Sequence, residues 1–430
     1  MANRTISNAG GNWKATTAWV EGAVPTASDA VIATATSGAL SLFETNGTTP
    51  ATDCVCASMV LTGYANTLTA PDGSSVNVYG AVTFATGMTI AGTGMLVIGN
   101  GATTSTITSA GKTWSGSLTF NGTGTKTLTG ALTIAATFTN LANCSTLGNY
   151  AITTQNYSSG GNLTIGGTGS LVVSGGSFNS QGMLTGNLDM TGSIAVSDCT
   201  YGGGTITCVS GTRQCSGTLS ISGNTTLNTP TANLVWDKIT VSNAATVTLT
   251  ANTSMSGLLT ISAAATITPS NLTVAGGYTG TAALTVTTGT LALTGGTVTS
   301  AGAITGLITV SGTTTIGNLK LGIAMLTCAS GTVTVTPGTT LTLTDTATLT
   351  VGAGLISWQN VTQTETKTIT LTNATMIRGN VTIAATKVAT WDAGIVYLGG
   401  TVTFGSGSGS LSGTSVITPF SNGGLTISIT

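Results

Sequence analysis

The chain offers few side chains that could act in catalysis or bind a metal. It contains no histidine, which removes Ser-His-Asp and Cys-His nucleophilic machinery, imidazole general bases and every histidine-containing metal site. No P-loop occurs, and no Gly-x-Gly-x-x-Gly motif has the spacing of a dinucleotide site. A calcium-binding nonapeptide is approached at residues 166–171, but Leu171 stands where the aspartate ligand should be. The sequence therefore predicts no cofactor and no metal.

Carboxylates are the remaining candidates, because paired Asp and Glu residues hydrolyse polysaccharides. The chain has 11 of them, among them Asp189, Asp198, Asp237, Asp345, Glu365 and Asp392. Asp189 and Asp198 are close enough in sequence to meet on neighbouring strands, and Trp391-Asp392 could pair a stacking platform with an acid. In the alternative interpretation each carboxylate caps a turn or lies singly on a solvated face. The 20 aromatic residues are dispersed, which favours that alternative, and we predict no catalytic residue and no enzyme.

The seven cysteines do not form a recognisable site. Their odd number leaves at least one thiol unpaired, and their spacings match no zinc pattern of the Cys-x-x-Cys kind. They are Cys54, Cys56, Cys144, Cys199, Cys208, Cys215 and Cys328. We interpret them as small buried hydrophobic residues. If residues 54–56 form a strand, both thiols of that pair project to one face.

Composition excludes several classes of partner. Only 5% of the residues are charged, against roughly 25% in an ordinary soluble domain, and polarity comes instead from Thr, Ser, Asn and 61 Gly. The 40% hydrophobic content and mean hydropathy of +0.41 argue against disorder. With a net charge of −1 and no basic stripe, we expect no nucleic-acid partner. No apolar stretch approaches 18 residues, so we expect no membrane insertion. The opening residues lack an apolar signal region, so we expect synthesis and folding in a cytoplasm.

One small theme repeats from about Val76 to the end of the chain. An apolar-Thr/Ser-apolar triplet is followed by Gly, Ser, Thr or Asn, as in Leu118-Thr-Phe120, Leu259-Thr-Ile261 and Val381-Thr-Ile383. Alternation with period 2 predicts short strands with one apolar face, and no segment shows the 3.6-residue period of a helix. Gly and Asn suit tight corners, because they tolerate a positive φ. The sequence therefore predicts an all-β chain.

The arrangement of the triplets favours a β-solenoid. They recur 8 to 20 residues apart with a few longer gaps, which fits two or three short strands per coil. Stacked β-sandwich modules would show similar spacing and remain the alternative. The monotony of the triplets favours a parallel β-helix, because identical coils bury them in one interior column. We expect this solenoid to span residues 51–404. Rows of Thr, Ser and Asn one coil apart could form ladders of hydrogen bonds.

The two ends of the chain differ from this repeat. Residues 1–50 are predicted to form an N-terminal capping region, in which Trp13, Trp19, the turn-forming Pro25 and Asp29 are the structural cap residues. At the other end, residues 405–430 are predicted to hold a Gly/Ser link, 405–410, and a C-terminal strand, 425–429.

The capping stretch carries a resemblance to known proteins. Asn12-Trp13, Trp19, Gly22, Val24-Pro25 and Asp29 through Ile32 resemble the N-W…W…G…V-P…D-x-V-x-I opening of many β-helical surface and adhesin-like proteins and of phage virion proteins. The resemblance covers about 25 residues. It implies a right-handed parallel β-helix whose first coils are sealed by the tryptophan pair. The leader and anchoring modules of bacterial members are missing, which favours the phage branch.

These observations leave three hypotheses for function. The first is a non-enzymatic structural component of a phage virion, exposed on the particle surface as a capsid decoration or fibre, which stabilises the particle or mediates host adhesion. The second is a bacterial surface adhesin, and the third a polysaccharide-degrading tailspike. For the first we expect a homotrimer, by analogy with phage fibres, with other virion proteins and host surface glycans as partners. The expected location is the virion surface, after synthesis in the host cytoplasm, and the cell surface is the alternative.

Overall fold

The chain forms two compact units that consist almost entirely of parallel β-strands. The computed structural model describes residues 1–99, 104–208, 213–228, 235–268, 271–328, 333–351, 357–358, 360–371, 375–378, 380–385, 387–392, 395–398, 401–404, 410–412, 416–419 and 426–429. Unit 1 is Met1–Ser216 and unit 2 is Gly217–Thr430, and strand β24 (Arg213–Ile221) begins in one and ends in the other. Within these residues the only helical segment is the short 3-10 helix η1 (Thr16–Ala18). The prediction of an all-β parallel β-solenoid is therefore confirmed.

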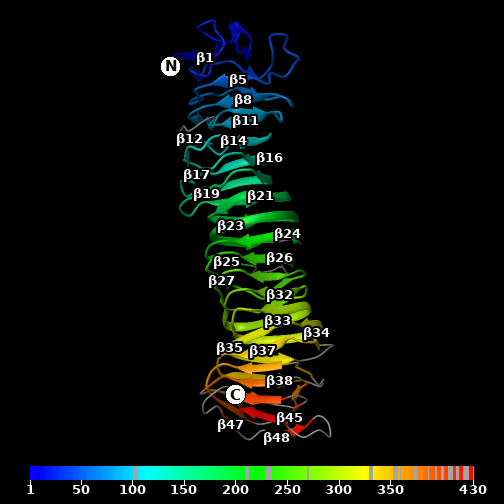
Figure 1. Ribbon diagram of the computed structural model, residues 1–430. Coiled ribbons are helices and arrows are strands. Elements are labelled where there is room, and N and C mark those ends of the chain that lie inside the picture. Colours follow the sequence, from blue (N-terminus) through cyan, green and yellow to red (C-terminus); the bar gives the residue numbers. More distant parts are fainter. Residues whose placement is uncertain are drawn as a thin grey trace. The chain divides into compact units, whose positions relative to one another are not determined.

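In unit 1 the strands of successive coils stack in parallel (Figure 1). Their pairing defines three stacks, and each coil after the first contributes to all three. Stack 1A contains β5 (Cys54–Cys56), β8 (Ser75–Val78), β11 (Met95–Ile98), β14 (Leu118–Phe120) and parts of β16 (Leu132–Asn140), β18 (Ile152–Ser159), β21 (Gly176–Thr185) and β23 (Ile194–Cys208). Stack 1B contains β1 (Asn3–Thr5), β3 (Ala30–Ile32), β6 (Ser58–Val60), β9 (Val82–Thr83), β12 (Ser105–Thr108), β15 (Lys126–Leu128), β17 (Cys144–Leu147), β19 (Leu163–Ile165) and parts of β21 and β23. Stack 1C contains two runs, β2 (Gly11–Asn12), β4 (Leu40–Ser41), β7 (Thr67–Thr69) and β10 (Thr89–Ala91), then β13 (Thr113–Trp114), β20 (Ser170–Val173), β22 (Asn187–Met190) and parts of β16, β18 and β23.

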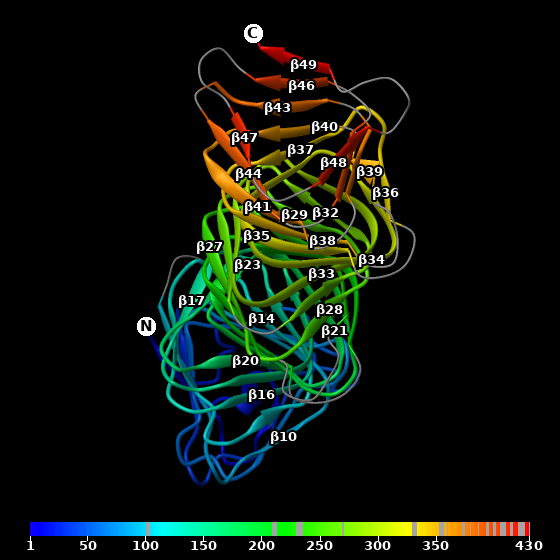
Figure 2. The same cartoon turned by 90° about the horizontal axis from the view of Figure 1, so that it is seen from below.

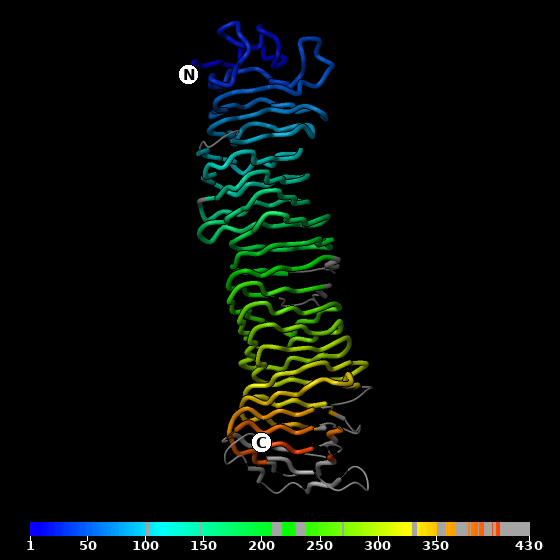
Figure 3. Tube along the Cα trace, in the orientation of Figure 1, coloured from blue at the N-terminus to red at the C-terminus, as the bar shows by residue number. Residues whose placement is uncertain are grey.

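Unit 2 has the same organisation. Its successive coils can be followed along the chain trace (Figure 3), and the pairing of their strands defines three stacks. Stack 2A contains β29 (Leu259–Ile261), β32 (Gly277–Gly280), β36 (Val333–Val335) and parts of β26 (Val235–Val241), β33 (Leu284–Ser300) and β34 (Ile304–Ile316). Stack 2B contains β25 (Thr225–Asn228), β27 (Ala245–Leu249), β30 (Ala265–Thr268), parts of β33, β34 and β35 (Leu319–Cys328), and then β37 (Thr340–Leu343), β40 (Asn360–Gln363), β43 (Val381–Ile383), β46 (Thr401–Phe404) and β49 (Thr426–Ile429). Figure 2 shows the later strands of this stack lying one beside the next.

Stack 2C completes each coil of unit 2. It contains β28 (Thr253–Met255), β31 (Leu272–Val274), parts of β26, β33, β34 and β35, and then β38 (Ala347–Val351), β41 (Lys367–Leu371), β44 (Val388–Asp392) and β47 (Ser410–Ser412). A further parallel sheet is formed by β39 (Ser357–Trp358), β42 (Thr375–Ile377), β45 (Ile395–Leu398) and β48 (Val416–Pro419).

The apolar members of the triplets form the predicted interior column. In β29, Leu259 and Ile261 are buried and Thr260 between them is half-exposed, as alternation along a strand requires. Stack 1A carries an aromatic ladder, in which the rings of Phe120, Phe138, Tyr157 and Phe178 lie 4.8, 5.5 and 5.2 Å apart between successive centroids. Contacts at these distances stabilise aromatic pairs beyond the area that they bury.

Asparagines at the corners tie each coil to the next. Asn252 accepts a hydrogen bond through Oδ1 from the backbone N–H of Asn271, at 3.2 Å, and Asn271 accepts one in the same way from Thr290, at 3.0 Å. A second ladder of the same kind, at the corner before stack 2B, links Asn360 to Asn380 and Asn380 to Thr401. These side chains satisfy corner N–H groups, which lie outside the strand pairing and would otherwise need another partner. The predicted asparagine ladders are confirmed.

Threonines and serines that directly follow a strand make a second kind of ladder. Thr344 donates through Oγ1 to the carbonyl of Leu321 at 2.8 Å, one coil earlier, and Thr250 donates to the carbonyl of Leu227 at 3.3 Å. Hydroxyls on the outer face also pair directly, as Thr268 and Thr248 do at 3.0 Å. The hydroxyl residues after each triplet therefore satisfy carbonyls at strand ends.

The chain ends contain strands as well. In the predicted capping region, 1–50, β1 and β3 pair in register with each other, and β3 pairs with β6 of the next coil. Of the predicted Gly/Ser link, residues 405–409 lie outside the described residues and Ser410 begins β47. The predicted terminal strand matches β49. No helix in the described part of the chain is long and apolar enough to cross a membrane.

The interior column generates a first prediction. Replacing Leu259 with Asp places a carboxylate among apolar side chains, so we expect the free energy of unfolding to fall by several kcal/mol. The matched change, Thr260→Asp, places the same charge on the outer face of the same strand and should cost about 0.5 kcal/mol. Urea denaturation followed by circular dichroism measures both. Equal losses for the two variants would contradict the assignment of the inner and outer faces.

Candidate functional site

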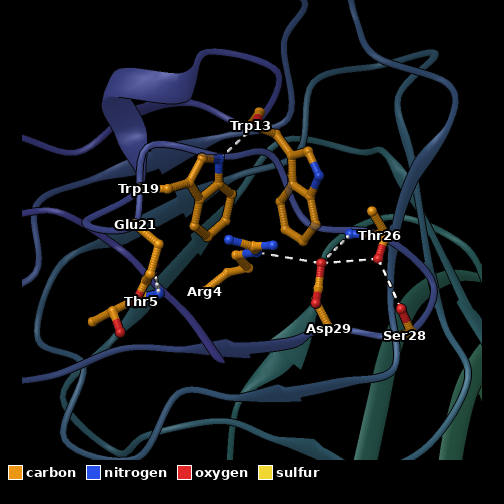
Figure 4. Close-up of polar contacts among 8 residues, drawn as sticks. All are labelled: Arg4, Thr5, Trp13, Trp19, Glu21, Thr26, Ser28 and Asp29. Atoms are coloured by element: carbon orange, nitrogen blue, oxygen red, sulfur yellow. Dashed lines mark hydrogen bonds and ion pairs between the residues drawn. The ribbon is translucent and has the colours of Figure 1, made fainter. Parts of the chain in front are cut away.

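Three of the four predicted cap residues, Trp13, Trp19 and Asp29, lie together in unit 1 (Figure 4). Trp13 is fully buried and Trp19 nearly so, with their ring centroids 5.2 Å apart and the rings at 80° to each other. The indole N–H of Trp19 donates to the backbone carbonyl of Trp13 at 2.9 Å (Figure 4). Pro25 is also buried. An edge-to-face pair of this kind is a rigid apolar cluster, and its role as a cap remains a prediction.

Asp29 organises the polar side of this cluster (Figure 4). Its Oδ2 atom accepts hydrogen bonds from the hydroxyl of Thr26 at 2.8 Å and the backbone N–H of Thr26 at 3.0 Å. The guanidinium Nε of Arg4, on β1, lies 3.3 Å from the same oxygen. The hydrogen bond from the Thr26 side chain, with help from Arg4, holds the pKa of the Asp29 carboxyl below its ordinary value. The network thus joins β1 to the residues that lead into β3.

The structure does not bring Asp189 and Asp198 together as a pair, so the expectation that they could meet on neighbouring strands is wrong. Asp189 lies in stack 1C, where its register partners are Val172 and Thr207. Asp198 lies in stack 1A, at the bulge where Phe178 pairs with Val196 and Ser180 with Cys199. One corner of the coil, residues 191–193 between β22 and β23, separates the two carboxylates, so they lie in different stacks although they are near in sequence.

The other candidate carboxylates are engaged locally or lie outside the described side chains. Glu365 forms an ion pair with Lys387 at 2.7 Å, and Asp345 accepts a hydrogen bond from the next backbone N–H at 2.7 Å. The side chains of Asp237, Trp391 and Asp392 fall outside the described part of the structure. Among the residues described, no group of three or more His, Cys, Asp or Glu side chains could hold a metal.

Six of the seven cysteines are buried, as the sequence interpretation expects. Burial raises the pKa of the Cys54 thiol to about 12, that of Cys144 to about 11 and that of Cys328 to about 12. A raised thiol pKa leaves almost no thiolate at neutral pH, and the thiolate is the nucleophile. The side chain of Cys215 lies outside the described residues.

One buried charged residue was not predicted from the sequence. Lys126 is fully buried, and its ammonium group donates to the carbonyl of Gly124 at 2.9 Å and to that of Gly122 at 3.5 Å. Burial lowers its pKa. Its position in the repeat could have indicated this burial. In Lys126-Thr-Leu128 the lysine takes the place of the inward-pointing apolar residue that begins other triplets.

An open groove in unit 2 is a second feature that sequence reasoning missed. Its volume is about 570 Å³, and its lining includes Thr279, Thr299, Asn318, Lys320, Thr340 and Thr342. These residues come from successive coils, on β32, β33, β35 and β37 and the corner before β35. The polar groups of the lining are hydroxyls, one amide and one ammonium group, and Ala301 and Leu319 also line the groove. These polar groups suit a polar ligand.

The Asp29 network predicts a pH dependence of stability. Because its pKa is lower in the folded chain, the contribution of Asp29 is complete above the unfolded value of about 3.9 and is lost as the pH falls through the folded value. We expect the fall in the thermal midpoint between about pH 7 and about pH 3 to be smaller in Asp29→Asn. The control is Asp72→Asn, which changes an exposed carboxylate. An unchanged pH dependence in Asp29→Asn would contradict the prediction.

Comparison of the chain with protein-family models, with curated proteins and with solved structures finds no match.

Proposed function

We propose that this chain is a non-enzymatic structural component of a phage virion, exposed on the particle surface as a capsid decoration or fibre. The observation that carries the proposal is the contrast between the interior and the reactive groups. Apolar columns and hydrogen-bond ladders recur through both units, whereas the described carboxylates and thiols are dispersed, paired or buried. A chain built in this way stabilises a particle or contacts a host by its shape and surface.

The structure bears differently on the two alternative functions, the tailspike and the adhesin. A polysaccharide-degrading tailspike needs two carboxylates across one sugar-binding site, and the separation of Asp189 from Asp198 takes away its best candidate pair. A bacterial surface adhesin would use the same fold and the same surface properties. The N-terminal stretch resembles the opening of bacterial surface proteins as well as that of phage virion proteins, so a location experiment is needed to separate the two.

We also propose that the protein is a homotrimer. An apolar patch in unit 2 supports association. It consists of Leu307, Ile323 and Met325, which are 43%, 61% and 43% exposed. Leu307 and Met325 are register partners on β34 and β35, and Ile323 is two residues from Met325 on the same outer side. Adjacent exposed apolar side chains of this size commonly mark an interaction surface.

The location of the protein tests the proposed function. Antibodies against the purified chain are expected to label the surface of intact phage particles in electron micrographs of a lysate from cells that carry the gene. Uninfected cells of the same host should remain unlabelled. Label on the surface of uninfected cells, with none on particles, would replace the virion component by the adhesin.

The patch predicts the state of association. Sedimentation velocity at micromolar concentration should show a trimer for the natural chain and a smaller species for the double variant Ile323→Lys, Met325→Lys, because each lysine would carry a charge into an apolar contact. The control is Val20→Lys, a change at an exposed apolar residue of unit 1, which should leave the trimer intact. A natural chain that sediments as a monomer would contradict trimer formation.

A further inference from the structure

The groove in unit 2 exists because one corner of the coil is short. Three residues, 281–283, connect β32 to β33, and three, 301–303, connect the end of β33 to β34. Only Gly317 and Asn318 connect β34 to β35, and four residues, 336–339, connect β36 to β37 in the next coil. The short corner lies between longer ones, which leaves an open depression across these coils.

Gly317 allows the short corner to pass close to the neighbouring coil. A Cβ atom at this position would lie 2.6 Å from the Cγ2 atom of Thr299, which is closer than real side-chain contacts. The backbone approaches Thr299 only because glycine has no side chain. The shape of the groove is therefore specified by the sequence at this corner and does not depend on a mobile side chain.

The only charge in this part of the chain lies in the groove. Between Lys238 and Asp345, Lys320 is the single charged residue in the sequence. It lies on β35 between the inward-pointing Leu319 and Leu321, so its side chain projects outward, where it lines the groove beside Thr342, its register partner. An ammonium group attracts an anion. The nearest carboxylate along the chain, Asp345, follows β37 in the adjacent coil and accepts a hydrogen bond from the backbone N–H of Thr346.

The other polar groups in the groove are hydrogen-bonding groups suited to hydroxyls, and they lie beside Ala301 and Leu319. Asn318 uses Oδ1 to accept from the backbone N–H of Thr340 at 2.9 Å, which leaves its two amide N–H donors facing away from that bond. Thr279, Thr299, Thr340 and Thr342 add hydroxyl groups from successive coils. Such groups both donate and accept, as the hydroxyls of a sugar do.

The groove lacks the features of other ligand classes. The one aromatic residue between Trp236 and Trp358 is Tyr278, and it is fully buried, so the groove offers no stacking surface for a nucleotide base. Its volume of about 570 Å³ falls within the range of small-ligand sites, about 300–1,000 Å³. Strands about 4.8 Å apart make the groove roughly 14 Å long over four coils, enough for a short linear oligosaccharide.

We propose that this groove binds an acidic saccharide. The ammonium group of Lys320 pairs with a carboxylate of the sugar, and the Asn318 amide and the threonine hydroxyls bind its hydroxyl groups. The inference deepens the proposed function, because it gives the exposed virion component a class of host-surface ligand. Adhesion through many copies would tolerate weak binding at each groove, since linked sites raise the overall avidity.

Titration calorimetry with defined trisaccharides tests the proposal. The probe is α-1,4-linked trigalacturonate, and its matched neutral control is α-1,4-linked trigalactose, which has a CH₂OH group in place of each carboxylate. We expect the full-length protein to bind the acidic trisaccharide at least tenfold more tightly than the neutral one. Added salt should weaken that binding, because an exposed ion pair is screened.

Single substitutions test whether the trisaccharide binds in the groove. Lys320→Gln should reduce affinity for trigalacturonate at least tenfold, whereas Lys238→Gln, which removes the same charge from an exposed position outside the groove, should not change it. Thr299→Val keeps the shape of the side chain, removes one hydroxyl and should reduce affinity severalfold with no change in the salt dependence. Circular dichroism of each variant confirms that it is folded, and Thr299→Val tests the groove if Lys320→Gln does not fold.

Several outcomes would overturn the proposal. They are equal binding of the two trisaccharides, no binding of either, or a Lys320→Gln variant that is folded and binds as the natural chain does. Displacement of the trisaccharide by an equal concentration of inorganic sulfate would reduce the groove to a general anion site and would also overturn it. None of these results changes whether antibodies label phage particles, so the proposed function and the ligand of the groove can fail separately.

Discussion

The structure depends on the parallel, in-register stacking of inward-pointing apolar side chains, one coil above the next. A coil takes about 20 residues, as the pairing of Leu118 with Phe138 and of Leu259 with Tyr278 shows. Because each strand has only three to five residues in most coils, no strand could persist alone. Its stability comes from the column and from backbone hydrogen bonds to both neighbours. The inner positions are therefore constrained and the outer positions are free to vary.

The corners explain how the chain remains ordered with so little charge. Backbone groups that leave the strand pairing need partners, and asparagine amides and threonine hydroxyls supply them from the adjacent coil. Ion pairs contribute little at exposed positions, so this arrangement loses little stability by lacking them. Because these corners are polar but uncharged, the surface carries few charges. A single lysine such as Lys320 therefore contributes strongly to the electrostatic potential around it.

The interior is not uniformly apolar. Asn140 donates through Nδ2 to the carbonyl of Gly161 at 2.9 Å, and the hydroxyls of Ser159 and Ser180 pair at 3.1 Å in successive coils of stack 1A. Lys126 lies buried nearby in the chain, with carbonyl partners. These groups are bonded to the backbone or to each other, as buried polar groups must be. They lie at strand ends, where the corner supplies carbonyls that are not used in strand pairing.

The sequence by itself determined the fold class, because period-2 triplets with Thr, Gly and Asn predict short strands and tight corners wherever they occur. It also indicated that Trp13, Trp19, Pro25 and Asp29 belong together, since they are unlike the repeat that follows. Only the tertiary structure decided which coils place which outer residues together. Asp189 and Asp198 are nine positions apart yet lie in different stacks, whereas Thr279 and Thr342 line one groove. The physical reason is that proximity across coils depends on the length of every corner between them, and one residue fewer at Gly317 and Asn318 changes the surface without changing the triplet pattern.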